Sequence, residues 1–310
     1  MSNRVHVIGR GIVAGRVARM LYDHTVLTLD PRRPYLVGVA AGDVVVLAHG
    51  GLYAGTAAAV LERGAHVVAV GDDVADTRAQ IELAERAAEL GVSLVVGAAM
   101  APGLAGLIAR HLGTGLTCVD EVHVAVHGTA GRTCARRHHQ SLRQTALGWH
   151  DGRWAEHLGG SGRELCWFPE PIGARDCYRA GHALPLLVDR AFPGVRRVSL
   201  RRSATRRDRL TARLPMLRSP HQEGGIGALR VEVRGADPAG GRACLIGGIA
   251  ELVGTAAGAG GAAAFATQIL DAELPTGLVV PGAAELPTLD LLHRVETFGV
   301  RLQEFTGIPT

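Results

Sequence analysis

Residues 5–14, Val5-His6-Val7-Ile8-Gly9-Arg10-Gly11-Ile12-Val13-Ala14, decide the fold of this chain. A short apolar run ends in the pattern Gly-x-Gly-x-x-Ala and leads into a segment with helical character. The first glycine permits a tight turn, the second lets a ligand approach the backbone, and the alanine allows helix and strand to pack closely. The pattern predicts a diphosphate bound at the free N–H groups of a helix N-terminus.

The end of the second predicted strand bears on the identity of the dinucleotide. Asp30 follows Gly11 by about 20 residues, where an acidic side chain accepts hydrogen bonds from the ribose 2′-hydroxyl of NAD. Arg32 and Arg33 come next and could hold the 2′-phosphate of NADP instead. A glycine turn in an unrelated α/β protein is the alternative. We predict NAD or NADP, with a slight preference for NAD, bound by Gly9, Gly11, Ile12, Val13, Asp30 and Arg32.

Residues 1–118 alternate apolar runs with helical segments. Continuous runs such as Val44–Leu47 and Val92–Val96 are typical of strands that are buried on both faces of a parallel sheet. The alternation predicts an α/β protein whose N-terminal domain, residues 1–118, is a doubly wound Rossmann domain.

The pattern changes after residue 118. Residues 121–127 alternate polar and apolar side chains, as a half-buried strand does, and turn-forming stretches separate similar later runs. This predicts a second α+β domain over residues 119–284, built on a mainly antiparallel sheet, which holds the substrate and forms a homodimer. The small-residue helix expected over Thr255–Leu270 should pack closely on another element, and a helix within residues 285–310 could pack back on the first domain.

Three stretches of the first domain resemble, in order, segments of the saccharopine dehydrogenase-like family: Val44–Gly55 (VVVLAHGGLYAG), Gly64–Val68 with Gly71-Asp72-Asp73, and Gly97–Gly103 (GAAMAPG). Residues 148–154 and 167–173 are similar to the second domain of that family. The resemblance implies an NAD(P)-dependent oxidoreductase that transfers a hydride to or from a carbon–nitrogen centre of an amino-acid-like or specialised-metabolite substrate. The chain departs from the lysine-using members of the family, because it contains no lysine.

The best catalytic candidates lie at a predicted strand end. In open α/β sheets, ligands bind outside the carboxyl ends of the strands. His49 could transfer a proton near neutral pH and Tyr53 could donate a hydrogen bond, so both are predicted as catalytic residues, and His49 and Gly50 also as cofactor contacts. His49 could equally hydrogen-bond only a nearby loop. The resemblance places Met100 and Pro102 at the nicotinamide pocket, Met100 toward the substrate and Pro102 toward the cofactor, although a Pro-Gly turn alone explains both.

The second domain offers further candidates for substrate contacts. His123 and His127 share one face of a predicted strand with Glu121 because their spacings are even, and the valines between them face the core. We predict that His123, His127 and Glu170 bind substrate, with solvent or a subunit contact as the alternative. No metal site is predicted, because the strand offers too few ligands.

Composition limits the partners of the protein. The chain has 310 residues, 47% hydrophobic and 20% charged, which indicates a globular protein. It has neither an apolar run of about 18 residues nor a signal-peptide core, so we expect a cytoplasmic protein without a membrane partner. A net charge of +4 with arginine clusters suits an anionic small-molecule substrate. Aromatic residues make up only 4% and do not interleave the arginines, which argues against nucleic-acid binding.

Two alternatives to carbon–nitrogen chemistry stay open. The same fold could reduce a carbonyl group in a biosynthetic pathway. A protein that binds NAD(P) without redox turnover is also compatible with the sequence, because no lysine is present to act as an acid or base.

Overall fold

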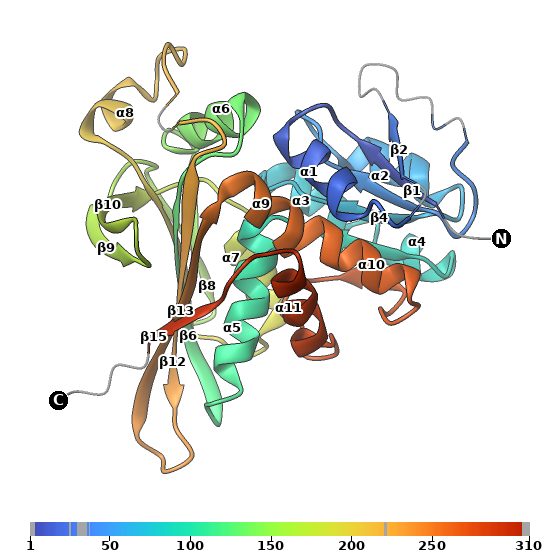
Figure 1. Ribbon diagram of the computed structural model, residues 1–310. Coiled ribbons are helices and arrows are strands. Elements are labelled where there is room, and N and C mark those ends of the chain that lie inside the picture. The colour runs from blue at the N-terminus through green and yellow to red at the C-terminus, as the bar shows by residue number, and fades with distance from the viewer. Residues whose placement is uncertain (1–3, 25, 30–35, 37, 220–221, 306–310) are drawn as a thin grey trace.

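Two β-sheets and the helices around them make up the molecule (Figure 1). The computed structural model describes residues 4–24, 26–29, 36, 38–219 and 222–305. The first domain comprises residues 4–117 with residues 253–300, and the second comprises residues 118–252 with the short strand at 303–305.

The first sheet has six parallel strands. In spatial order they are β14 (Gly277–Val279), β5 (Ser93–Val96), β4 (His66–Ala69), β3 (Val44–Leu47), β1 (Val5–Ile8) and β2 (Val26–Leu29). Every residue of β1, β3 and β5 is buried, as continuous apolar runs require. The strands β2 and β3, which follow β1 in the chain, pair with opposite edges of β1. A topological switch point therefore lies at the carboxyl end of β1.

Helices cover this sheet and confirm the predicted Rossmann architecture. They are α1 (Ile12–Met20), α2 (Ala54–Leu61), α3 (Val74–Ile81), α4 (Ala84–Glu89), the kinked turn η1 (Met100–Leu104), in which Ala101 has an extended backbone, and α5 (Ala105–Gly113). Helix α5 has two roles, because it follows the last consecutive strand of the first domain and also packs against β6, β12 and β13 of the second sheet (Figure 1). One continuous apolar core therefore extends through both domains.

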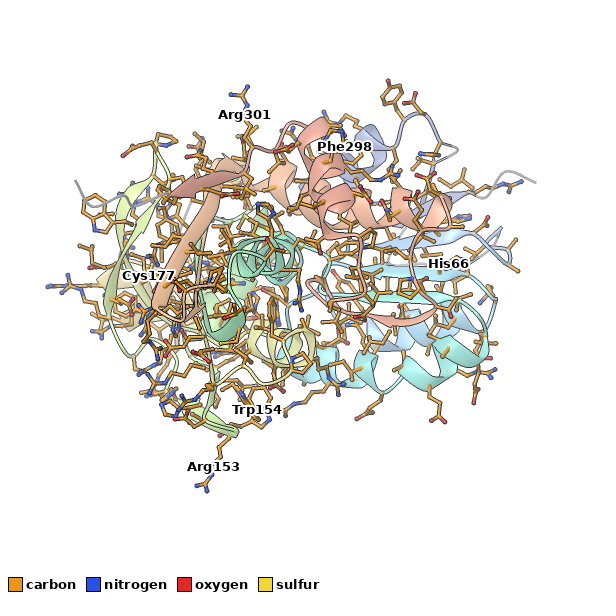
Figure 2. All side chains as sticks on the ribbon, turned by 90° about the horizontal axis from the view of Figure 1, so that it is seen from below. His66, Arg153, Trp154, Cys177, Phe298 and Arg301 are labelled. Carbon is orange, nitrogen blue, oxygen red and sulfur yellow. The ribbon has the colours of Figure 1, made fainter. Side chains whose placement is uncertain are left out.

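The second sheet has nine strands and is mainly antiparallel, as predicted. They are β6 (Cys118–His127), β7 (Ala146–His150), β8 (Arg153–His157), β9 (Glu164–Phe168), β10 (Gly173–Arg179), β11 (Arg197–Ser203), β12 (Ile226–Ala236), β13 (Arg242–Leu252) and β15 (Gln303–Phe305). Among the described strands, only β6 and β11 run parallel to each other. Figure 2 shows Arg153 and Trp154 at the lower edge of the molecule, where the β7–β8 hairpin turns.

Three helices accompany the second sheet: α6 (Arg132–Ser141), α7 (Leu184–Ala191) and α8 (Arg206–Thr211). Helices α6 and α8 lie at the same end of the second domain (Figure 1). The strand β6 alternates as expected, since its three central valines are buried while His123 and His127 belong to the other face.

The C-terminal part of the chain returns to the first domain. It forms α9 (Val253–Ala257), η2 (Gly258–Ala263), α10 (Ala264–Leu270) and α11 (Thr288–Thr297), and places β14 beside β5. The predicted boundary at residue 284 differs from this arrangement, because residues 253–284 pack on the first sheet. The close packing expected of the small-residue helix is present: a Cβ on Gly261 would lie 1.0 Å from the carbonyl oxygen of Ala98.

Candidate functional site

A cleft of about 620 Å³ lies between the two domains, at the carboxyl ends of the parallel strands. The loops after β1, β3, β4 and β5 form one wall of this interdomain cleft. The end of β6, the first turns of α6 and one arginine of β11 form the other wall. The predicted site residues that line the cleft are Gly11, Ile12, Val13, His49, Gly50, Tyr53 and Met100.

The glycine loop after β1 has the geometry that a dinucleotide needs. A Cβ on Gly9 would lie 2.4 Å from the carbonyl oxygen of Ala48, so only glycine lets β1 and β3 end this close together. Gly11 is the N-cap of α1, and no side chain caps this helix or places an acidic group in its first turn. A Cβ on Gly11 would meet nothing within 4 Å, so the space in front of these N–H groups is open. The loop therefore fits a diphosphate held by backbone donors.

His49 is oriented by its own loop. Its Nδ1 lies 2.8 Å from the carbonyl oxygen of Gly50, which can only accept, so Nδ1 carries the proton and Nε2 of the neutral ring has a free lone pair. The Tyr53 hydroxyl donates to the backbone oxygen of His49 at 2.6 Å, and the two rings meet edge to face at 4.7 Å. Tyr53 thus fixes the position of His49, and the imidazole can accept or deliver a proton in the cleft.

Tyr53 itself is held as a neutral donor. Burial raises the pKa of its hydroxyl, and the negative charges of Asp72 and Asp76 raise it further. The Asp76 carboxylate accepts from the backbone N–H groups of Tyr53 and Ala54 at 3.0 Å and from the side chain of Gln80 at 2.9 Å. Asp76 therefore caps the first turn of α2 from the neighbouring helix and is not available as a base.

A group of charged side chains that the sequence did not single out spans the two walls. Asp72 and Asp73 follow β4, and both accept from the guanidinium of Arg137 on α6, at 3.1 and 2.8 Å. Arg202 on β11 donates to Asp72 at 2.5 Å. We call these four residues, with His182, the Asp72 cluster. Its position after a strand at the switch-point edge is a signal that could have identified Asp72.

Asp72 is ionised within this cluster. Burial alone would raise the pKa of its carboxyl, but the guanidinium groups of Arg202 and Arg137 outweigh this effect and hold the pKa well below its ordinary value. The two aspartates and two arginines balance in charge, so the cluster links the domains without a net charge in the cleft.

His182 completes the cluster as a neutral ring. Its Nδ1 accepts from the backbone N–H of Leu184 at 3.0 Å, so the proton is on Nε2, which lies 3.5 Å from a carboxylate oxygen of Asp72. Burial lowers the pKa of His182 to about 3, and the positive charge of Arg202 adds to this shift. The ring is therefore uncharged at neutral pH.

Several predicted residues lie elsewhere. Pro102 is buried beside the cleft and packs against Gly97. His123 and His127 lie on the opposite face of β6 from Val126, which lines the cleft; they contact Ser199 and Ser203, each at 2.8 Å. The structure thus does not bring them together with His49.

Glu170 lies in the exposed turn between β9 and β10 and is not among the residues that line the cleft. Asp30 and Arg32 are outside the described residues.

Within the described part of the chain, no group of three or more His, Cys, Asp or Glu side chains is arranged to hold a metal ion. Nor does that part contain a helix long and apolar enough to cross a membrane.

Comparison with known proteins identifies the fold. No family model and no curated protein matches this chain. Saccharopine dehydrogenase (L-Glu forming) from Saccharomyces cerevisiae aligns with a TM-score of 0.69 and 13% identity, over 98% of this chain and 99% of that one. C. glutamicum DAP dehydrogenase in complex with DAP aligns with a TM-score of 0.53 and 13% identity, over 94% of this chain and 95% of that one. An engineered D-amino acid dehydrogenase bound to NADP⁺ aligns with a TM-score of 0.51 and 12% identity, over 94% of this chain and 96% of that one. The resemblance noted in the sequence is thus confirmed as a shared fold.

Proposed function

We propose that this protein is an NAD(P)-dependent oxidoreductase that transfers a hydride to or from a carbon–nitrogen centre of an amino-acid-like or specialised-metabolite substrate. The observation that carries the proposal is the combination in one cleft of an open, uncapped helix N-terminus at Gly11 with an oriented, proton-transferring side chain at His49. The first suits a dinucleotide and the second suits the proton that accompanies hydride transfer.

The proteins that share the fold support the choice of bond. Saccharopine dehydrogenase, a DAP dehydrogenase bound to DAP and a D-amino acid dehydrogenase bound to NADP⁺ are all dehydrogenases of amino acids. One of these enzymes is named as forming L-Glu, and another is named as a D-amino acid dehydrogenase and holds NADP⁺, which favours carbon–nitrogen over carbonyl chemistry here. The choice between NAD and NADP depends on Asp30 and Arg32 and stays a prediction.

The residues of the chain would share the work as follows. The N–H groups at the start of α1 bind the diphosphate, and a bound nicotinamide ring supplies or receives the hydride. His49 accepts or delivers the substrate proton through Nε2, and Tyr53 holds His49 in place. Met100 is the buried apolar contact beside the reacting centre, and the Asp72 cluster fixes the second domain over the site. Each of these steps needs the two walls at a fixed separation.

The first test separates cofactor binding from folding. Because open space surrounds the Cβ position of Gly11, Gly11→Val should fold normally and fill the diphosphate space. We expect it to weaken NADH and NADPH binding at least about 100-fold, measured by calorimetry, because it blocks several charge-assisted hydrogen bonds. Gly15→Ala, one turn further along α1 and equally open, is the matched control and should bind as the parent does. Absence of dinucleotide binding by the parent protein would refute the proposal.

The second test addresses the reaction. A panel of imines, amino acids and carbonyl compounds is screened by NAD(P)H absorbance. His49→Ala should lower turnover about 100-fold or more with dinucleotide affinity unchanged, as loss of a general acid–base does. His150→Ala, an exposed histidine of β7, is the control. Turnover of carbonyl compounds alone would favour the carbonyl reductase alternative, and tight binding without any turnover would favour a non-catalytic protein.

A further inference from the structure

A second cavity, of about 560 Å³, lies beside the interdomain cleft in the second domain. It is formed by α6, by α8 and by the segment that follows α8, at the end of the domain where Figure 1 places both helices. Glu223 lines both this cavity and the cleft, so the two spaces adjoin. None of the site residues predicted from the sequence lines it.

The lining combines an apolar wall with a buried polar group. Leu214, Pro215 and Leu217 form the apolar side, and their exposure leaves that side open to a ligand. His139 lines the cavity although the residue is only 4% exposed, and it makes no hydrogen bond to any described residue. The imidazole can donate and accept hydrogen bonds, so a ligand group in the cavity can pair with His139.

Two arginines and two carboxylates line the cavity, so their formal charges cancel, and what distinguishes them is which groups already have partners. Arg207 and Arg218 line it, and neither forms an ion pair with a carboxylate among the described residues. Of the two carboxylates, that of Asp208 accepts from the backbone N–H and the hydroxyl of Thr205 at 3.0 and 2.7 Å, and Glu223 lines the boundary with the interdomain cleft. Two guanidinium groups thus stand available at the edge of an apolar wall.

We propose that this cavity is a binding site for an amphipathic anion, that is, a small molecule with an apolar body and a carboxylate, sulfonate or phosphate end. The apolar body would contact the leucines, and the anionic end would pair with Arg207, Arg218 and His139. The inference does not depend on the proposed oxidoreductase activity, because no residue of the dinucleotide loop or of the Asp72 cluster contributes to the cavity.

The probe for the test is 1-anilinonaphthalene-8-sulfonate, whose fluorescence rises in apolar surroundings. Titration of the full-length protein should show one saturable site that persists when NADH is present in excess. Decanoate should displace the probe, and decyltrimethylammonium, of matched chain length and opposite charge, should not. Displacement by both surfactants, displacement by NADH, or non-saturable binding would each contradict the proposal.

Variants of lining residues, each matched with a control variant outside the cavity, test whether the probe binds in this cavity. Arg218→Gln and Leu214→Asn should each weaken probe binding about tenfold, the effect of one charge-assisted contact or one apolar side chain. Arg213→Gln and Leu210→Asn change exposed residues of the same segment that do not line the cavity, and should bind as the parent does. All four positions are at the surface, so folding, checked by circular dichroism, should be preserved. Equal effects of the lining and control variants would overturn the assignment.

Discussion

The two walls of the interdomain cleft are built by different means. The first-domain wall consists largely of backbone: Gly9 lets two strand ends approach, and Gly11 exposes the N–H groups of α1. The second-domain wall acts through long side chains, since Arg137 and Arg202 reach across to Asp72. The backbone wall tolerates no added atom at Gly9, where two strand ends meet, whereas the side-chain wall depends on charges that a change of pH or sequence can remove.

The largest effect is expected at the backbone wall. Gly9→Ala places a Cβ 2.4 Å from a carbonyl oxygen, which backbone shifts alone can relieve. We expect the free energy of unfolding to fall by about 3 kcal/mol, as overpacking does at its upper range, measured by urea denaturation. Gly15→Ala, where the Cβ meets open space within a helix, should not destabilise. A stable Gly9→Ala variant would show that the loop can move.

The next effect is expected at the side-chain wall. Arg202→Met removes a buried ion-pair partner of Asp72. The Asp72 side chain is 22% exposed and retains its ion pair with Arg137. Unfolding should become easier by about 2 to 3 kcal/mol, less than for a fully buried pair because solvent and Arg137 screen the remaining charge. Arg196→Met breaks an exposed pair with Asp151 and should cost under about 0.5 kcal/mol. Equal costs for both variants would mean that the cluster adds nothing beyond a surface ion pair.

A smaller effect is expected on acidification. His182 has a pKa of about 3 in the folded protein, below its ordinary value, so the unfolded chain binds the proton first as pH falls below about 6.5. Stability is then lost toward low pH, at no more than about 1.4 kcal/mol per pH unit. His182→Gln should flatten this dependence between pH 6.5 and 5, by up to about 2 kcal/mol in unfolding experiments. Asp72 contributes in the same direction, but only below pH 4, where its unfolded form takes up protons.

The smallest effect is expected at the hydroxyl of Tyr53. Tyr53→Phe removes the 2.6 Å hydrogen bond to the backbone of His49 and should lower stability by about 1 kcal/mol. If Tyr53 only positions His49, turnover should fall less than about tenfold, and the pH dependence that His49 gives to the turnover should be retained. Tyr22→Phe, at an exposed tyrosine, is the control. A loss as large as that of His49→Ala would instead make Tyr53 a catalytic residue.

The sequence predicted the parts of the site that local backbone geometry determines. The Rossmann domain and the glycine loop could be predicted because each depends on a pattern of a few neighbouring residues, namely Gly9, Gly11 and the buried runs of β1 and β3. Arg137 and Arg202 were seen only as members of arginine clusters. Their partner Asp72 lies 65 and 130 residues away, and no local pattern links side chains at such separations.

The second-domain candidates show the same limit. Even spacing placed His123 and His127 on one face of β6, as the structure has it, but could not say which face would meet the cleft. The return of residues 253–284 to the first sheet was unreadable for a related reason, because a three-residue strand such as β14 gives almost no periodic signal. The homodimer and the cytoplasmic location stay predictions.

The return of the chain from β13 into α9 has a practical consequence for dissecting the protein. Gly254 of α9 lies so close to Ile12 that a Cβ there would be 2.6 Å from the isoleucine side chain, and β14 completes the edge of the first sheet. A fragment ending near residue 118 would therefore lack both the residues that cover α1 and one strand of its sheet. We expect such a fragment to be insoluble when expressed alone and to be rescued when residues 253–310 are supplied as a separate peptide, so that the Rossmann domain is a split module and not an excisable one.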